Sequence, residues 1–137
     1  MLFRSPLEGL VTGLAAQRRT ETHLAALNEL VVVGREAAAE RRLHELPTLN
    51  TEFHDTLAVA AGNELLRSTL GRLSDIIRWV YAARISRRST RSWDEHAAIV
   101  DAVADGDVER ASRCGEEHIA AAAAAYQSPL QHSGRTD

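Results

Sequence analysis

Two polar residues, Asn50 and His54, interrupt an otherwise apolar pattern in the stretch LNTEFHDTLAVAAGN. They stand four residues apart, about one helical turn, so in a helix both side chains project from the same side. The other residues on that side are apolar, which indicates that it faces the protein core. A buried amide and a buried imidazole both need polar partners.

Two further histidines share this inward orientation. His96 is in line with Ile99 and Val103 at helical spacing, and His118 is in line with Ala122. One inward histidine is commonly a hydrogen-bonded core residue. Three on different helices favour a shared metal ion, because helical bundles build metal sites from side chains on facing helices. The other three of the six histidines fall at a helix start, a charged helix end and the tail: His23, His44 and His132.

The elements that would position these histidines are helical throughout. Apolar residues recur at steps of three and four, and an alternating strand pattern is found nowhere over a useful length. The sequence therefore predicts an all-α bundle of about six helices. Their expected ranges are Pro6 to about Arg18, Thr20 to the charged run ending at Arg42, near Pro47 to Gly62, Asn63 to Ser86, Ser92 to Gly106, and Asp107 to about Tyr126.

Capping residues mark the expected helix starts. The spacing of a capping box, in which a serine is followed three residues later by a glutamate, occurs twice. The pairs are Ser5 with Glu8 and Ser92 with Glu95. Single capping side chains are expected at Thr20, Asn63 and Asp107.

Composition limits the possible classes of protein. With 137 residues, 45% of them hydrophobic, the chain has the size of one compact domain. A balance of 16 basic against 19 acidic residues gives no general footprint for nucleic acid or an anionic membrane. The single cysteine, Cys114, excludes an internal disulfide framework and a cysteine-based zinc finger. We expect a soluble cytoplasmic protein in which residues 1–127 form one domain and residues 128–137 a frayed tail.

The ordered set of motifs resembles a known family. The segment EHAAIVDAVADGDVERASRCGEEH is similar to the C-terminal part of the FCD domain, the effector-binding domain of FadR-like GntR transcriptional regulators. Its matching positions are Glu95, His96, Ile99, Ala102, Asp107, Ala111 and His118. Upstream, the family's Asp-x-x-Phe-His and Gly-Asn resemble Asn50, Phe53, His54, Gly62 and Asn63, and its opening Arg-x-x-Leu-Glu resembles Arg4, Leu7 and Glu8. The resemblance spans about residues 4–123.

The resemblance implies an antiparallel bundle around one divalent transition metal ion, zinc or nickel, with a small carboxylate effector completing the coordination. Carried over residue by residue, the metal ligands would be Asn50, His54, His96 and His118. Asn50 stands where the family has an aspartate, which should weaken metal binding but leave more positive charge for an anionic effector. The alternative is that the metal has been lost and Asn50 hydrogen-bonds His54 in an empty polar pocket.

An anionic effector needs a countercharge besides the metal. Arg72 lies between apolar residues of the predicted long helix, and its guanidinium could bind a carboxylate through two hydrogen bonds. A salt bridge to a neighbouring helix is the alternative role for Arg72. Arg4 is the second candidate, and Asn63 and Thr69 could supply neutral hydrogen bonds.

The winged helix-turn-helix that the family carries before this domain has no counterpart in the 137 residues. The chain is therefore expected to be either a fragment or a stand-alone sensor. The basic run AARISRRSTRS is interpreted as the solvated end of the long helix and its turn. We expect a homodimer that binds no operator DNA by itself and no membrane.

Two other functions were weighed. Three histidines on zinc with an open position could support a metal hydrolase. Against it, the nearby carboxylates Glu95 and Asp55 directly adjoin a histidine in sequence and so should point off the helix face. A dimerisation module that has lost its metal is the third reading. The favoured prediction is a metal-dependent sensor of a small carboxylate metabolite, not an enzyme.

Overall fold

The computed structural model describes residues 4–81 and 88–127, and the side chains in these ranges except those of residues 4, 74–81 and 125–127. Helices account for nearly all of this part of the chain, and it contains no strand. The elements are α1 (Arg4–Arg18), α2 (Glu21–Ala39), the short 3-10 turn η1 (Leu43–Glu45), α3 (Leu46–Ala61), α4 (Glu64–Tyr81), α5 (Ser89–Ala104) and α6 (Val108–Gln127). The predicted all-α bundle is confirmed.

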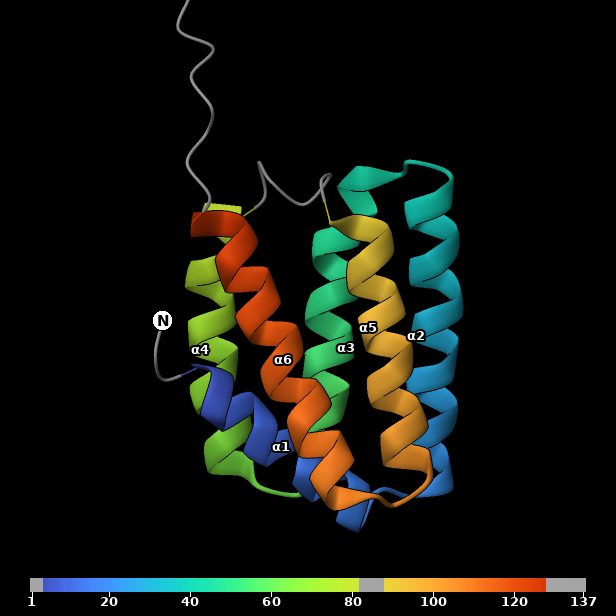
Figure 1. The fold of residues 1–137 in the computed structure, drawn as a ribbon, viewed down its shortest axis with the longest axis vertical. Helices are drawn as coiled ribbons and strands as arrows, with labels where there is room; N and C mark the ends of the chain where they lie inside the picture. Colours follow the sequence, from blue (N-terminus) through green and yellow to red (C-terminus); the bar gives the residue numbers. More distant parts are fainter. Residues whose placement is uncertain (1–3, 82–87, 128–137) are drawn as a thin grey trace, which may run out of the picture.

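Successive helices from α2 to α6 alternate in direction along the long axis of the bundle, and α1 crosses near one end (Figure 1). Helix α1 packs against α6 and α3, while α2 packs against α5 and α3. Helix α5 also packs against α6, and α4 lies against α3 and α1. Buried side chains including Leu27, Phe53, Leu57, Ile99 and Val103 form the core between them.

Three predicted helix caps are confirmed. Thr20, Asn63 and Asp107 each accept a hydrogen bond through a side-chain oxygen from the backbone N–H three residues later, at 3.2, 3.1 and 3.1 Å. These bonds satisfy N–H groups that have no partner within the first helical turn. At the other end of α3, Gly62 has a φ of 68°, the left-handed conformation that lets the chain turn into α4.

The two predicted capping boxes are wrong. Ser5 lies inside α1, and its hydroxyl donates to the carbonyl oxygen of Glu116 on α6 at 2.9 Å. Ser92 lies inside α5, where its N–H donates to the carbonyl of Arg88 at 2.7 Å, as in any helix interior. In both cases the chain is already helical before the serine, so its spacing to a glutamate has no capping function.

Some predictions fall outside the described residues. The fourth helix was expected to reach Ser86, and the structure describes α4 to Tyr81. Arg84 and Arg87 of the basic run, and the tail 128–137 with His132, also lie outside the description.

The close approach of α2 and α5 depends on Gly34. A Cβ atom at this position would overlap the ring of Trp93, which is buried against the core. We expect Gly34→Ala to lower the free energy of unfolding by about 1–3 kcal/mol, the usual cost of overpacking, partly offset by the better helix propensity of alanine. Urea unfolding measures this change.

Gly71 on α4 offers the matched control, because nothing lies within 4 Å of a Cβ atom placed there. Gly71→Ala should raise the free energy of unfolding by about 0.5–1 kcal/mol, since glycine loses more conformational freedom than alanine in a helix. Equal effects of the two substitutions would show that the contact with Trp93 does not limit the packing of α2 on α5.

Candidate metal centre

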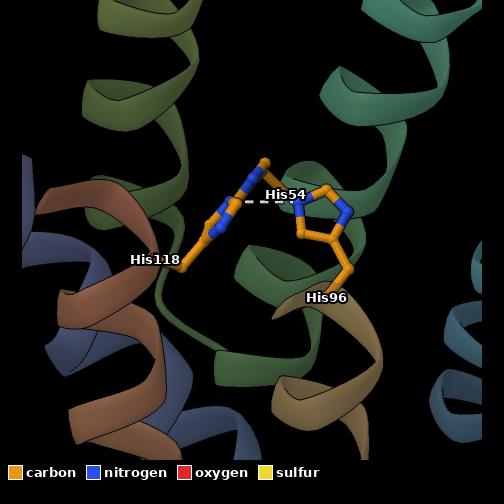
Figure 2. Close-up of side chains that lie close together, drawn as sticks. All are labelled: His54, His96 and His118. Carbon is orange, nitrogen blue, oxygen red and sulfur yellow. Dashed lines mark hydrogen bonds between the residues drawn. The ribbon is translucent and has the colours of Figure 1, made fainter. Parts of the chain in front are cut away.

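Three buried histidines from three helices meet in the interior. His54 comes from α3, His96 from α5 and His118 from α6, and Figure 2 shows their rings pointing toward one another. Their side chains are almost inaccessible, with 8%, 0% and 4% of the residue surface exposed. One nitrogen of each ring lies within 4.8 Å of a nitrogen of the other two. A single small ion could therefore contact all three imidazoles.

Aromatic packing holds the rings in place. The ring of His96 stacks on Phe53 with 4.1 Å between centroids and 12° between planes, and Trp93 meets it edge-on at 4.4 Å. The rings of His54 and His118 are nearly parallel, 5.4 Å apart. Because Phe53 directly precedes His54 on α3, the same helical turn supplies one histidine and the stacking surface for another.

Hydrogen bonds define the protonation pattern of the cluster. Nδ1 of His118 lies 2.8 Å from Oε1 of Glu95, and an ionised carboxylate can only accept, so Nδ1 carries the proton. Nε2 of His118 then presents a lone pair, and it lies 3.0 Å from Nε2 of His96. Nδ1 of His54 and Nδ1 of His96 are buried and make no hydrogen bond within the described part of the chain. The protein alone thus leaves part of this polar cluster unsatisfied.

The electrostatic environment favours the neutral form of His96 and His118. Burial holds the pKa of His96 well below its ordinary value, and the neighbouring His118 and His54 lower it further. Burial also lowers the pKa of His118, against the opposing effect of Glu95. Neutral imidazole is the form that binds a metal, so at neutral pH these two histidines are ready to act as ligands.

Glu95 is a component of the site that the sequence interpretation placed elsewhere. It was expected to point off the helix face, yet its carboxylate reaches His118 on the neighbouring helix. Arg88, assigned to a solvated run, donates from one guanidinium nitrogen to both oxygens of Glu95 at 2.7 and 2.8 Å. Burial opposes the charged form of Glu95, but the hydrogen bonds from His118 and Arg88 outweigh it and lower its pKa. Glu95 is consequently a weak base.

A second buried carboxylate approaches the cluster from α1. Glu8 has 2% of its surface exposed, and its Oε2 lies 3.5 Å from Nδ1 of His54. This separation is within ion-pair range but does not meet the geometry of a hydrogen bond. Nδ1 of His54 is therefore without a hydrogen bond in the described part of the chain. Sequence reasoning included Glu8 only as part of a family motif, because nothing along α1 indicates which helix it faces.

The donor set fits a transition metal ion. Imidazole nitrogen suits zinc, nickel and copper better than magnesium or calcium, and three such donors converge at a buried point. The carboxylate behind His118 is the outer-shell partner that metal-binding histidines usually have. Asn50 lies one turn before His54 on α3 and is half-buried.

A cavity of about 280 Å³ lies beside the cluster, between α1, α3 and α4. Its wall includes Glu8, Thr51, His54, Asp55, Arg67 and Leu70. Arg67 donates to both carboxylate oxygens of Asp55, at 3.0 and 3.3 Å, and lies 3.5 Å from Glu64. A small molecule in this cavity would have the imidazole of His54 and the guanidinium of Arg67 among its surroundings.

Of the residues predicted to bind an effector, Asn63, Thr69 and Arg72 do not line this cavity. Arg72 and Thr69 are exposed on α4 and do not line it, and Thr69 donates its hydroxyl to the carbonyl of Leu65 at 2.8 Å. Asn63 caps α4. Arg4 begins α1, and its side chain lies outside the description. Arg67, which the sequence analysis did not single out, is the arginine among the described residues that lines the cavity.

No helix in the described part of the chain is long and apolar enough to cross a membrane.

Comparison with known proteins places this arrangement in a family. The sequence matches the FCD domain over residues 1–121. The HTH-type transcriptional repressor NanR of Cronobacter sakazakii is 27% identical over 131 residues, 90% of this chain and 48% of that protein. The HTH-type transcriptional regulator LutR of Bacillus subtilis is 29% identical over 125 residues, 85% of this chain and 55% of that protein.

A solved structure has the same fold. The protein described as Streptococcus agalactiae GntR superposes with a TM-score of 0.78 at 25% identity, covering 88% of this chain and 54% of that one. The chain thus spans about half the length of the relatives it matches. Because the family match covers most of its residues, the chain belongs to the FCD domain family.

Proposed function

We propose that this chain is the metal-dependent effector-sensing domain of a GntR-type transcriptional regulator. The observation that carries the proposal is the convergence of three buried imidazoles from three helices, those of His54, His96 and His118. In two of them, His54 and His96, Nδ1 makes no hydrogen bond within the described part of the chain. The names of the relatives, a transcriptional repressor and a transcriptional regulator, support the regulatory role. The domain would act in the cytoplasm as a homodimer and bind no operator DNA without further parts of the regulator.

The metal in this proposal is one divalent transition ion, zinc or nickel. The three histidines would hold it, with Asn50 as a fourth, neutral ligand from the turn before His54. The bound ion supplies positive charge in a buried place, which favours an anionic ligand.

The effector in this proposal is a small carboxylate that occupies the cavity beside His54. Arg67 replaces Arg72 as the proposed countercharge, because Arg67 lines the cavity and Arg72 is exposed on α4. Arg67 donates to both carboxylate oxygens of Asp55, so an effector must compete with Asp55 for its N–H groups.

A thermal-shift screen tests the sensor proposal. Sugar acids, hydroxy acids and dicarboxylates are added to zinc-loaded and to chelator-treated protein. A ligand that binds only the folded state at a hundredfold excess over Kd stabilises it by about 2.7 kcal/mol, so at least one acid should raise the melting temperature, and chelator should abolish the rise. Shifts that persist in full after metal removal would contradict metal dependence. Consumption of the acid during incubation would instead indicate an enzyme.

Asn50→Asp tests the fourth ligand. A carboxylate binds a divalent cation more tightly than an amide, so the substitution should lower the dissociation constant for zinc by about tenfold or more. Competition with a chromogenic chelator measures it. Asn28→Asp adds the same charge on the exposed surface of α2, a helix that supplies none of the three clustered histidines, and should leave the constant unchanged. Equal constants for both variants would mean that Asn50 is not a ligand.

A further inference from the structure

Arg88 stands at the N-terminal cap position of α5 with a largely buried side chain. Its side chain has 12% of its surface exposed, and one guanidinium nitrogen donates to both oxygens of Glu95. By comparison, the side chains of Arg35 on α2 and Asp94 on α5, which also form an ion pair, are 51% and 62% exposed. Exposed pairs contribute little because water competes for both partners, whereas a sheltered pair can hold a side chain in one position.

Glu95 connects this arginine to the histidine cluster. Its Oε1 accepts from Arg88 at 2.7 Å and from Nδ1 of His118 at 2.8 Å. Three groups therefore form a continuous chain from the start of α5 to the buried imidazole on α6. Arg88 and Glu95 are seven residues apart, two helical turns, which places both on the side of α5 that faces α6.

The position of His118 depends on this carboxylate. The hydrogen bond to Glu95 keeps the proton on Nδ1 and turns Nε2 toward His96. A glutamate side chain has several rotatable bonds, and without a second anchor it could swing toward solvent and release the imidazole. Arg88 supplies that anchor, because it donates to both oxygens of the carboxylate, including the oxygen that His118 contacts.

We propose that Arg88 is a positioning residue of the metal centre, acting through Glu95 to orient His118. The proposal rests on the metal-binding function proposed above and adds to it a residue outside the ligand set. Outer-shell partners of metal-binding histidines commonly contribute 10- to 100-fold to metal affinity. The expected consequence is that a residue at the start of α5, about two helical turns before the proposed ligand His96, controls how tightly the metal is held.

The test is the dissociation constant for zinc, measured by chelator competition, together with the visible spectrum of the cobalt-substituted protein. Arg88→Gln should weaken zinc binding about tenfold or more and change the cobalt spectrum, because His118 loses its fixed orientation. Arg35→Gln removes a comparable but exposed arginine of a salt bridge and should change neither measurement. Arg88→Lys keeps the charge, and an ammonium group can also donate to both oxygens, so a smaller loss is expected than in Arg88→Gln. Arg88→Lys is the variant to measure if Arg88→Gln fails to fold.

A double-mutant cycle separates positioning from a general effect on stability. If Arg88 acts through Glu95, the variant carrying both Arg88→Gln and Glu95→Gln should bind zinc about as weakly as Glu95→Gln alone. Additive losses, or a zinc constant and cobalt spectrum unchanged in Arg88→Gln, would overturn the proposal while leaving the metal site intact. Absence of zinc binding by the wild-type protein would overturn the metal function as well.

Discussion

Removal of zinc should lower the free energy of unfolding of this domain by about 4 kcal/mol when the free ion stands a thousandfold above its dissociation constant. The effect is large because the ion binds the folded chain and has no comparable site in the unfolded one. His54, His96 and His118 lie on three different helices, and only the packing of α3, α5 and α6 brings their nitrogens within 4.8 Å. Binding free energy at such a site becomes folding free energy.

Denaturant unfolding at a fixed free zinc concentration, with and without chelator, measures this difference. His96→Gln should abolish the zinc-dependent part of the stability, because it removes a fully buried ligand. The matched control is His44→Gln, since His44 is exposed in η1 and should leave the zinc-dependent part intact. Protein purified without chelator that carries less than about a tenth of an equivalent of any transition metal, and shows no response to added zinc, would refute the site.

The metal-free domain should lose stability steeply as the pH falls below about 6.5, the ordinary pKa of histidine. In the folded state the pKa of His96 is lowered well below this value by burial, and that of His118 is lowered by the same cause. As the pH falls, the unfolded chain takes up these protons first, so the stability is present above the unfolded pKa and lost below it. Each such histidine adds a slope of about 1.4 kcal/mol per pH unit.

Unfolding measured in chelator at several pH values between 8 and 5 tests this expectation. The pKa of Glu95 is also lowered, but its contribution is lost only below its ordinary value of 4.5, so the two pH ranges are separate. His96→Gln should reduce the slope between pH 6.5 and 5, because one of the two groups no longer titrates. A free energy of unfolding that stays constant from pH 8 to pH 5 in the metal-free protein would contradict the buried neutral histidines.

The sequence by itself determined the helices and their inward faces. Apolar steps of three and four define the buried side of each helix, and that side carries His54, His96 and His118 without reference to any other element. The caps at Thr20 and Asn63 were equally predictable, since a cap joins a side chain to a backbone group three residues away. These features depend on residues three or four positions apart, so the sequence is enough to predict them.

The tertiary structure alone decided which side chains meet across helices. Periodicity gives the direction of Glu95 around α5, but the distance and angle between α5 and α6 determine that its carboxylate reaches His118. The same holds for Glu8 beside His54, and for the choice of Arg67 over Arg72 at the cavity. Long polar side chains near the edge of a helix face can turn to solvent or to a neighbour. Which they do is set by where the neighbouring helix packs, and that is a property of the whole bundle.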